Sequence, residues 1–282
     1  MLDVILIILT LTVLVIASYT DLKTREVPDW LNFSLIISAL GIRLIFSFVY
    51  SWKYFVSGLL GFGVCLIFAY LFYYSDQWGG GDSKLFMGMG AVIGINLPIT
   101  FNSFGLLWFF IALILLGAVY GLLWILITAI WKRKKFWKDF KKNVKKNKLL
   151  HIFSAVISIT ILIIGLFKFY WLPLAIFPLG FFYLYYLVIS VEKNCFLKKM
   201  SIKGLTEGDW LAKPVFIKGK MVMRKKTLEL EDLDLLKKFH KEKKLNKVLI
   251  KEGIPFIPSF LFAYLALLLA GNISNWLLNN LF

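Results

Sequence analysis

The sequence predicts an all-α, polytopic membrane protein of about eight transmembrane helices, with a small cytoplasmic α+β segment. The chain has 282 residues, 60% of them hydrophobic, and its mean hydropathy is +0.77. Soluble domains are closer to half apolar. The apolar residues gather in blocks, and most blocks have about the 20 residues that an α-helix needs to cross a bilayer. The basic residues lie between these blocks, as expected for loops that set membrane orientation.

Eight blocks are predicted to span the membrane. They are Met1–Thr20, Leu31–Tyr50, Tyr54–Ser75, Ser83–Leu97, Phe104–Trp131, Leu149–Phe167, Tyr170–Val191 and Pro255–Trp276. The fourth block is the shortest and is rich in glycine, at Gly88, Gly90 and Gly94. Small residues let helices approach closely in membranes, so we expect this helix to pack tightly against its neighbours.

The distribution of lysine and arginine predicts the orientation. A net charge of +17 would suggest nucleic acid as a partner for a soluble chain. Here residues 132–148 carry ten basic and one acidic residue, and residues 192–253 carry seventeen and nine. With eight spans, both stretches lie on one side, which the positive-inside rule places in the cytoplasm. We therefore expect a multi-pass cell-membrane protein with both chain ends outside and no nucleic-acid partner.

The segment between the last two spans is predicted to be soluble. Residues 214–223 indicate a short hairpin around Lys218-Gly219. Residues 228–245 have the apolar spacing of an amphipathic helix. The basic loop 132–148 either contacts anionic lipid headgroups or serves only as an orientation signal.

Two aspartates are the candidates for chemistry. Asp21 ends the first span, and Asp82 follows Gly79-Gly80-Gly81 and opens the fourth span on the same side. Acidic residues at bilayer depth are costly and indicate function. Two carboxylates in contact can share one proton, so that one takes a proton from water while the other polarises a carbonyl group. The glycines are expected to give unusual backbone angles and to let a substrate strand approach closely.

Such acid–base chemistry requires no metal and no cofactor, and none is expected. The chain has two histidines and two cysteines, too few to suggest a zinc centre or a disulfide framework. The sequence indicates no oligomeric state.

Two motifs resemble those of a known family. The segment Asp21–Asn32, DLKTREVPDWLN, resembles the first aspartate motif of the type IV prepilin peptidases, in which Asp is followed after five residues by Ile or Val, Pro, and Asn or Asp. The segment Gly79–Leu85, GGGDSKL, resembles their second motif, GxGD-x-K. The segment Lys251–Pro258, KEGIPFIP, resembles the archaeal branch, the preflagellin and prepilin peptidases.

The resemblance implies an aspartic endopeptidase of the GxGD type, with Asp21 and Asp82 as the catalytic pair. Its substrates would be pilin-like or flagellin-like precursors, whose leader peptides are cut at the cytoplasmic membrane boundary. Many bacterial relatives also methylate the new N-terminus and carry a cysteine cluster. Since this chain has only two cysteines, no methyltransferase activity is expected.

Other residues take supporting roles in this prediction. Those matching the motifs are Pro28, Gly79, Gly80, Gly81 and Lys84. Candidates for orienting a substrate are Lys23, Arg25 and Asp76, with Lys84 beside them. Alternatively, the basic residues among them serve only as orientation charges. Asp29 and Glu26 are expected to flank the second helix.

The resemblance suggests four parts. They are a catalytic membrane core (1–131), a basic cytoplasmic loop with two extra spans (132–191), a soluble cytoplasmic segment (192–253) and a C-terminal transmembrane helix (254–282). The stretch 131–191 has no counterpart in the shorter six-span preflagellin peptidases.

Two alternatives remain open from the sequence. A presenilin-type intramembrane protease shares the GxGD motif but is expected to have its partner aspartate inside a hydrophobic span. Asp21 lies at the end of a span and precedes a polar loop, which favours the leader-peptidase hypothesis. A non-enzymatic transporter or scaffold would predict two similar halves, and no internal repeat is evident.

Overall fold

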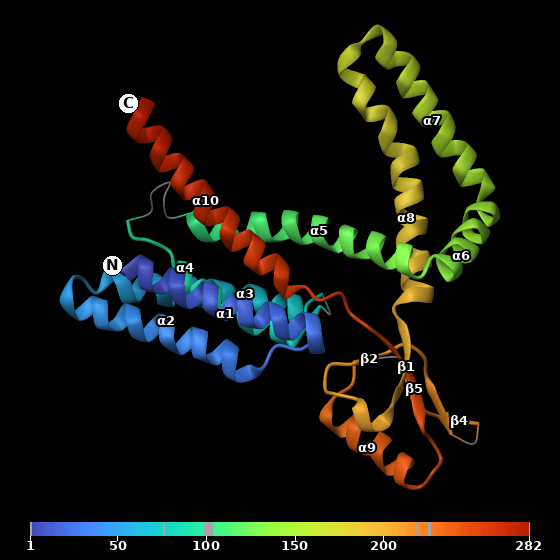
Figure 1. Ribbon diagram of the computed structural model, residues 1–282, viewed down its shortest axis with the longest axis horizontal. Coiled ribbons are helices and arrows are strands. Elements are labelled where there is room, and N and C mark those ends of the chain that lie inside the picture. The colour runs from blue at the N-terminus through green and yellow to red at the C-terminus, as the bar shows by residue number, and fades with distance from the viewer. Residues whose placement is uncertain (1, 76, 99–103, 218, 225–226, 282) are drawn as a thin grey trace. The chain divides into compact units, whose positions relative to one another are not determined.

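The computed structural model describes residues 2–75, 77–98, 104–217, 219–224 and 227–281, with side chains up to residue 270. In these ranges the chain is mainly α-helical, and short strands occur between Leu197 and Lys251 (Figure 1). The chain divides into two compact units. One comprises Met1–Leu122 with Ile254–Phe282, and the other comprises Leu123–Gly253.

Six helices among the described residues are long and apolar enough to cross a membrane. They are α1 (Leu2–Thr24), α2 (Asp29–Val49), α3 (Lys53–Tyr74), α5 (Gly105–Trp131), α7 (Lys148–Phe167), and α8 (Ile176–Cys195) with the preceding 3-10 helix η2 (Phe169–Ala175). Of the other two predicted spans, α4 (Gly80–Ile93) has only 14 residues. α10 (Ile257–Leu281) has 25 residues, and its side chains are described as far as Ala270. The structure confirms a polytopic helical membrane protein.

In the first unit, α4 packs closely against both α2 and α3. A methyl group added to Gly61 of α3 would lie 2.2 Å from the carbonyl oxygen of Gly90 in α4. One added to Gly90 would lie 2.7 Å from the Cβ atom of Cys65. The backbones of α3 and α4 are therefore in direct contact, as the glycine-rich sequence predicted.

The end of α4 is held by a buried arginine from α2. Arg43 is 5% exposed, and its Nη2 atom donates hydrogen bonds to the carbonyl oxygens of Val92 (2.6 Å) and Ile93 (3.2 Å). Its Nη1 atom donates to the carbonyl oxygen of Tyr54 at 3.1 Å. A cation at a helix C-terminus satisfies carbonyls that lack partners within the helix and complements the helix dipole. Arg43 thereby fixes the position of α4 along its axis.

Residues 132–148, predicted as a loop, instead form helix α6 (Arg133–Lys146). Its buried and half-buried positions recur every three or four residues, at Phe136, Phe140 and Asn143. This face packs against α8, where Asn143 Nδ2 donates a 3.1 Å hydrogen bond to Ser190 Oγ. The basic residues take the remaining positions, so the stretch forms a helix with one apolar face.

The part of the second unit between α8 and α10 is a small α+β segment, as predicted. Its elements are β1 (Leu197–Ser201), η3 (Ile202–Gly204), β2 (Trp210–Leu211), β3 (Val215–Ile217), β4 (Lys220–Met223), α9 (Leu230–Lys241) and β5 (Lys247–Lys251). β1, β5 and β2 form an antiparallel sheet in that order, and β3 pairs with β4 in the predicted hairpin. Gly219 has the positive φ of +80° that the turn requires, and Lys218 lies outside the described residues. Leu233 and Leu236 of α9 are buried in the core of this segment, which confirms the amphipathic helix.

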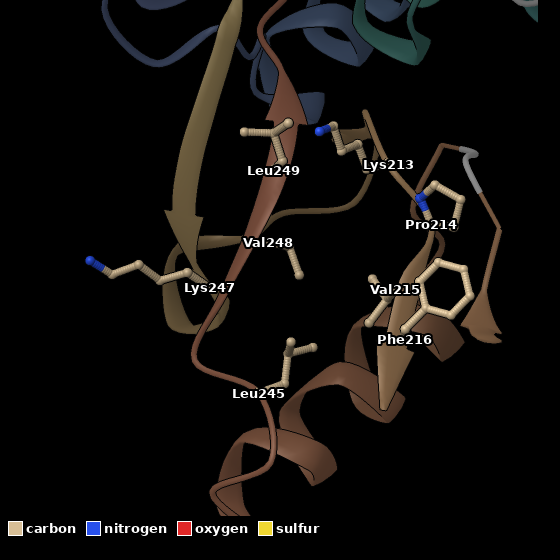
Figure 2. A pocket seen from close by; sticks show the side chains of 8 residues that line it. All are labelled: Lys213, Pro214, Val215, Phe216, Leu245, Lys247, Val248 and Leu249. Carbon is tan, nitrogen blue, oxygen red and sulfur yellow. The ribbon is translucent and has the colours of Figure 1, made fainter. Parts of the chain in front are cut away.

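A hollow of about 220 Å³ lies between β3 and β5 in this segment (Figure 2). Val215, Leu245 and Val248 turn their side chains toward it, while Lys247 points away. Its lining residues include no carboxylate, so it offers no acid–base pair of its own.

Candidate active site

Asp21 lies in the last turn of α1, because the helix continues past the predicted end at Thr20 to Thr24. Its side chain is only 6% exposed. The carboxylate is satisfied by a residue 236 positions away, since the backbone N–H of Ile257 donates a buried 2.9 Å hydrogen bond to Asp21 Oδ2. Ile257 is the first residue of α10. The carboxylate therefore accepts from a free amide at a helix N-terminus, where the helix dipole favours negative charge.

Asp82 is the third residue of α4 and is half-buried. Its Oδ2 atom accepts a 3.2 Å hydrogen bond from the backbone N–H of Gly79, the residue that precedes the helix. Asp82 thus caps the N-terminus of its own helix. Both predicted catalytic aspartates are held by backbone amides at the beginning of a helix, Asp82 by that of Gly79 before α4 and Asp21 by those of Ile257 and the preceding Phe256 at α10.

Both aspartates belong to the first unit and lie close enough for their charges to interact. The charge of Asp21 also reaches Arg25, just beyond the end of α1, and Tyr120 of α5. Two carboxylates that interact in a partly buried site can hold one proton between them. Such a pair combines a base with an acid, and this combination can activate water against a carbonyl group.

An aromatic cluster connects the two aspartate segments. The ring of Trp78, just before Gly79, lies 6.2 Å from that of Phe256 and 6.0 Å from that of Phe260, measured between centroids. Phe86 of α4 lies 5.2 Å from Trp78 in an edge-on arrangement. These contacts pack the beginning of α10 against the beginning of α4. The helix that supplies the amide to Asp21 is thereby packed against the segment that carries Asp82.

Lys84, one of the motif residues, forms an ion pair within the site. Its Nζ atom lies 2.6 Å from Oδ1 of Asp29 in the first turn of α2, and 5.6 Å from the ring centre of Phe33. Asp29 flanks the second helix as predicted, and the pair links the beginnings of α2 and α4. The preceding Pro28 is the N-cap residue of α2, and its carbonyl oxygen accepts the N–H of Leu31 at 3.0 Å.

The substrate-orienting candidates lie in different settings. Lys23 places its ammonium group 5.6 Å from the ring centre of Tyr19, on the same helix. Arg25 has a positive φ of 63° and its N–H bonds to the carbonyl oxygen of Asp21, so it ends α1. Asp76 lies outside the described residues. A role for any of these residues toward a substrate stays a prediction.

The expectation that the motif glycines adopt unusual backbone angles was wrong. Gly79 is extended, at φ −72° and ψ 165°, and Gly80 and Gly81 form the first turn of α4. Positive φ among the described glycines occurs at Gly94, Gly208 and Gly219. Helix beginnings use ordinary angles, so nothing here demands glycine for conformation. Close approach of a substrate remains the predicted reason for these glycines.

Three buried polar side chains near the aspartates in sequence were missed. Ser18 lies one turn before Asp21, Ser83 follows Asp82, and Asn32 is in the first turns of α2. Their side-chain polar atoms are buried, and no described residue gives them a hydrogen-bond partner. Unsatisfied buried groups are uncommon and often mark functional sites. Of the three, Asn32 could have been singled out from the sequence, because it is the last residue of the first motif segment.

Comparison with known proteins agrees with the motifs. Residues 8–122 match the model of the type IV leader peptidase family. A preflagellin peptidase of Methanocaldococcus jannaschii is 39% identical over 88 residues, which cover 30% of this chain and 37% of that protein. A preflagellin peptidase of Methanococcus voltae is 35% identical over 81 residues, which cover 28% of this chain and 34% of that protein. One of Methanococcus maripaludis is 30% identical over 96 residues, which cover 33% of this chain and 41% of that protein.

The chain thus spans between about a third and two fifths of the length of these relatives. Both Asp21 and Asp82 fall inside the stretch that the family model covers. The predicted resemblance is confirmed over residues 8–122, where this chain is similar to the type IV leader peptidase family.

Proposed function

We propose that this protein is a membrane aspartic endopeptidase that removes the leader peptide from pilin-like or flagellin-like precursors. The observation that carries the proposal is the pair Asp21 and Asp82. The two charges interact within one compact unit, and each carboxylate is held by a backbone amide at a helix beginning. The three similar preflagellin peptidases favour a leader-bearing substrate over a presenilin-type cleavage inside a transmembrane helix.

The pair would work with one shared proton. The ionised carboxylate takes a proton from water, and the water oxygen attacks the carbonyl carbon of the scissile bond while the protonated carboxyl group donates to the carbonyl oxygen. The tetrahedral intermediate collapses, the carbon–nitrogen bond breaks, and the leaving nitrogen takes up a proton. Activity therefore requires a single proton on the pair, and it falls at low pH when both carboxyl groups are protonated and at high pH when both are ionised.

The substrate fits the boundary position of the pair. A leader-bearing precursor has a polar leader followed by an apolar helix. The apolar helix stays in the bilayer while the bond between the two parts rests at the boundary, on the side that carries the basic stretches and is proposed to be cytoplasmic. Cleavage without methylation is expected, because the described cysteines, Cys65 and Cys195, are separate and buried.

The test is cleavage of a panel of leader-bearing precursors by the purified full-length protein. Asp21→Asn and Asp82→Asn are each expected to lower the rate by at least ~10²- to 10⁴-fold, the contribution of a positioned acid or base. Asp234→Asn is the matched control, since it makes the same change at an exposed acid of α9 and breaks only its exposed ion pair with Lys237. Full activity in either of the first two variants, with all three proteins folded, would end the proposal.

A further inference from the structure

Helix α6 connects two membrane spans and presents two different faces. α5 ends at Trp131 and α7 begins at Lys148, and both are long enough to cross a membrane. α6 therefore begins and ends at one membrane boundary. Its apolar face, centred on Phe136, packs against α8, and its basic side chains are exposed. They are Arg133, Lys134, Lys135, Lys138, Lys141, Lys142, Lys145 and Lys146. A helix that joins two spans at one boundary and exposes a basic face is placed to meet lipid headgroups.

The apolar face of α6 borders a cavity of about 230 Å³. It is lined by residues from three helices of the second unit, among them Ala129 and Ile130 of α5, Phe136, Trp137 and Phe140 of α6, and Leu187 of α8. Every lining residue is apolar. The cavity is half open, and walls of this composition favour contact with hydrocarbon over contact with water.

A cation lies beside the cavity, next to one of its lining residues. Trp137 is 51% exposed, and the Lys141 ammonium group lies 6.0 Å from the centre of its ring. Among the other charges of this stretch, Lys132 donates to the carbonyl oxygen of Cys195, and Asp139 accepts from Asn143. Lys141 therefore combines an exposed ammonium group with a position directly beside the apolar slot.

We propose that this cavity binds one acyl chain of an anionic phospholipid, with the lipid headgroup held by Lys141 and the neighbouring basic residues of α6. The apolar cavity suits the acyl chain of the lipid, and the basic face of α6 suits its phosphate group. Neither feature alone indicates a lipid. Together the cavity and the basic face match the two ends of a phospholipid. Both features belong to the helix that joins two membrane spans, where the protein meets the bilayer surface.

The experiment is native mass spectrometry of the full-length protein, counting the phosphatidylglycerol and phosphatidylcholine molecules that it retains in detergent. The wild type is expected to retain phosphatidylglycerol in preference. Lys141→Gln should weaken that retention about fivefold, the effect of one basic residue at an anionic surface. Ala129→Phe, which fills the cavity, should reduce retention of both lipids.

Matched controls lie elsewhere in the same unit. Lys237→Gln removes an exposed lysine from α9, and Gly180→Leu adds an apolar side chain to α8 where there is open space. Both should retain lipid like the wild type. Equal retention of the two lipids by the wild type would overturn the proposal, and so would a preference that both Lys141→Gln and Ala129→Phe leave intact. Displacement of the bound lipid by glycerol phosphate would overturn the role of the cavity. Lys141 is exposed, so its variant keeps the test decisive if Ala129→Phe fails to fold.

Discussion

The hydrogen bond from α10 to Asp21 can be removed by one substitution that keeps the helix. Ile257 is the first residue of α10, a position where proline is well tolerated because its amide has no partner within the helix. Ile257→Pro therefore deletes the N–H that donates to Asp21 at 2.9 Å while preserving the helix beginning. The matched control is Ile257→Val, which has a side chain of similar size and retains the N–H group.

The size of the effect follows from the geometry of this bond. It is buried and charge-assisted, and such bonds contribute about 1.5–3 kcal/mol. If that stabilisation holds the Asp21 carboxylate in its working position and charge state, its loss lowers kcat/KM by about ten- to a hundredfold, at ~1.4 kcal/mol per factor of ten. The Ile257 side chain is fully buried, so both variants also lose packing, at a cost of about 0.5–1.5 kcal/mol of stability for the valine.

The assay is the initial rate of leader cleavage at subsaturating precursor, normalised to the folded fraction from thermal unfolding. We expect Ile257→Val to cleave at nearly the wild-type rate and Ile257→Pro to be at least tenfold slower. A proline variant within twofold of the valine variant, at equal folded fraction, would show that the amide contributes nothing to the reaction. The pairing of α10 with Asp21 would then be architectural only.

Two further predictions concern glycines, and each has its own measurement. Gly61→Ala places a methyl group 2.2 Å from the Gly90 carbonyl oxygen, so it should destabilise the protein by about 1–3 kcal/mol. Gly63→Ala on the same helix meets open space and should leave the stability unchanged. Thermal unfolding of the two variants tests this difference. Equal stabilities would mean that α3 and α4 are not in backbone contact. Gly81→Ala has room, with its nearest neighbour at 3.4 Å, so it should fold normally but cleave more slowly if a substrate strand passes there. An unchanged cleavage rate would remove close approach as the reason for the motif glycine.

The helices were predictable where the bilayer imposes a length and a composition. The spans at residues 31–50 and 54–75 match α2 and α3 to within two residues, because only a run of apolar residues can cross hydrocarbon. Helix α6 was not predicted because its many basic residues favoured a loop, although its apolar residues have the spacing of a helix. Phe136, Phe140 and Val144 recur every four residues, which is the spacing of one helix face.

The two aspartates could be singled out in the sequence because acidic residues are rare in the apolar spans, and the predicted spans put both at one membrane face. The donor to Asp21 was not found, and the reason is physical. A backbone N–H exists at nearly every residue, so no amino-acid type marks the one at Ile257. The contact joins positions 236 residues apart, and only the packing of α1 against α10 brings them together. The roles of both aspartates in catalysis stay a prediction.

The length of α4 has a consequence for how a substrate reaches Asp82. A helix of 14 residues is ~21 Å long, about 9 Å less than the hydrocarbon thickness of a typical bilayer. Lys84 pairs with Asp29 at the beginning of α2, and Gly81 lies against Val27, so the Asp82 end of α4 is level with the beginning of α2. The shortfall therefore lies at the other end of α4, where Arg43 binds the last carbonyl groups six residues before α2 ends. A helix that ends early in hydrocarbon has carbonyl groups that lipid cannot satisfy, and Arg43 supplies those hydrogen bonds. Asp82 thus stays at the depth where α2 begins, and a precursor can reach it from the boundary without descending into the hydrocarbon.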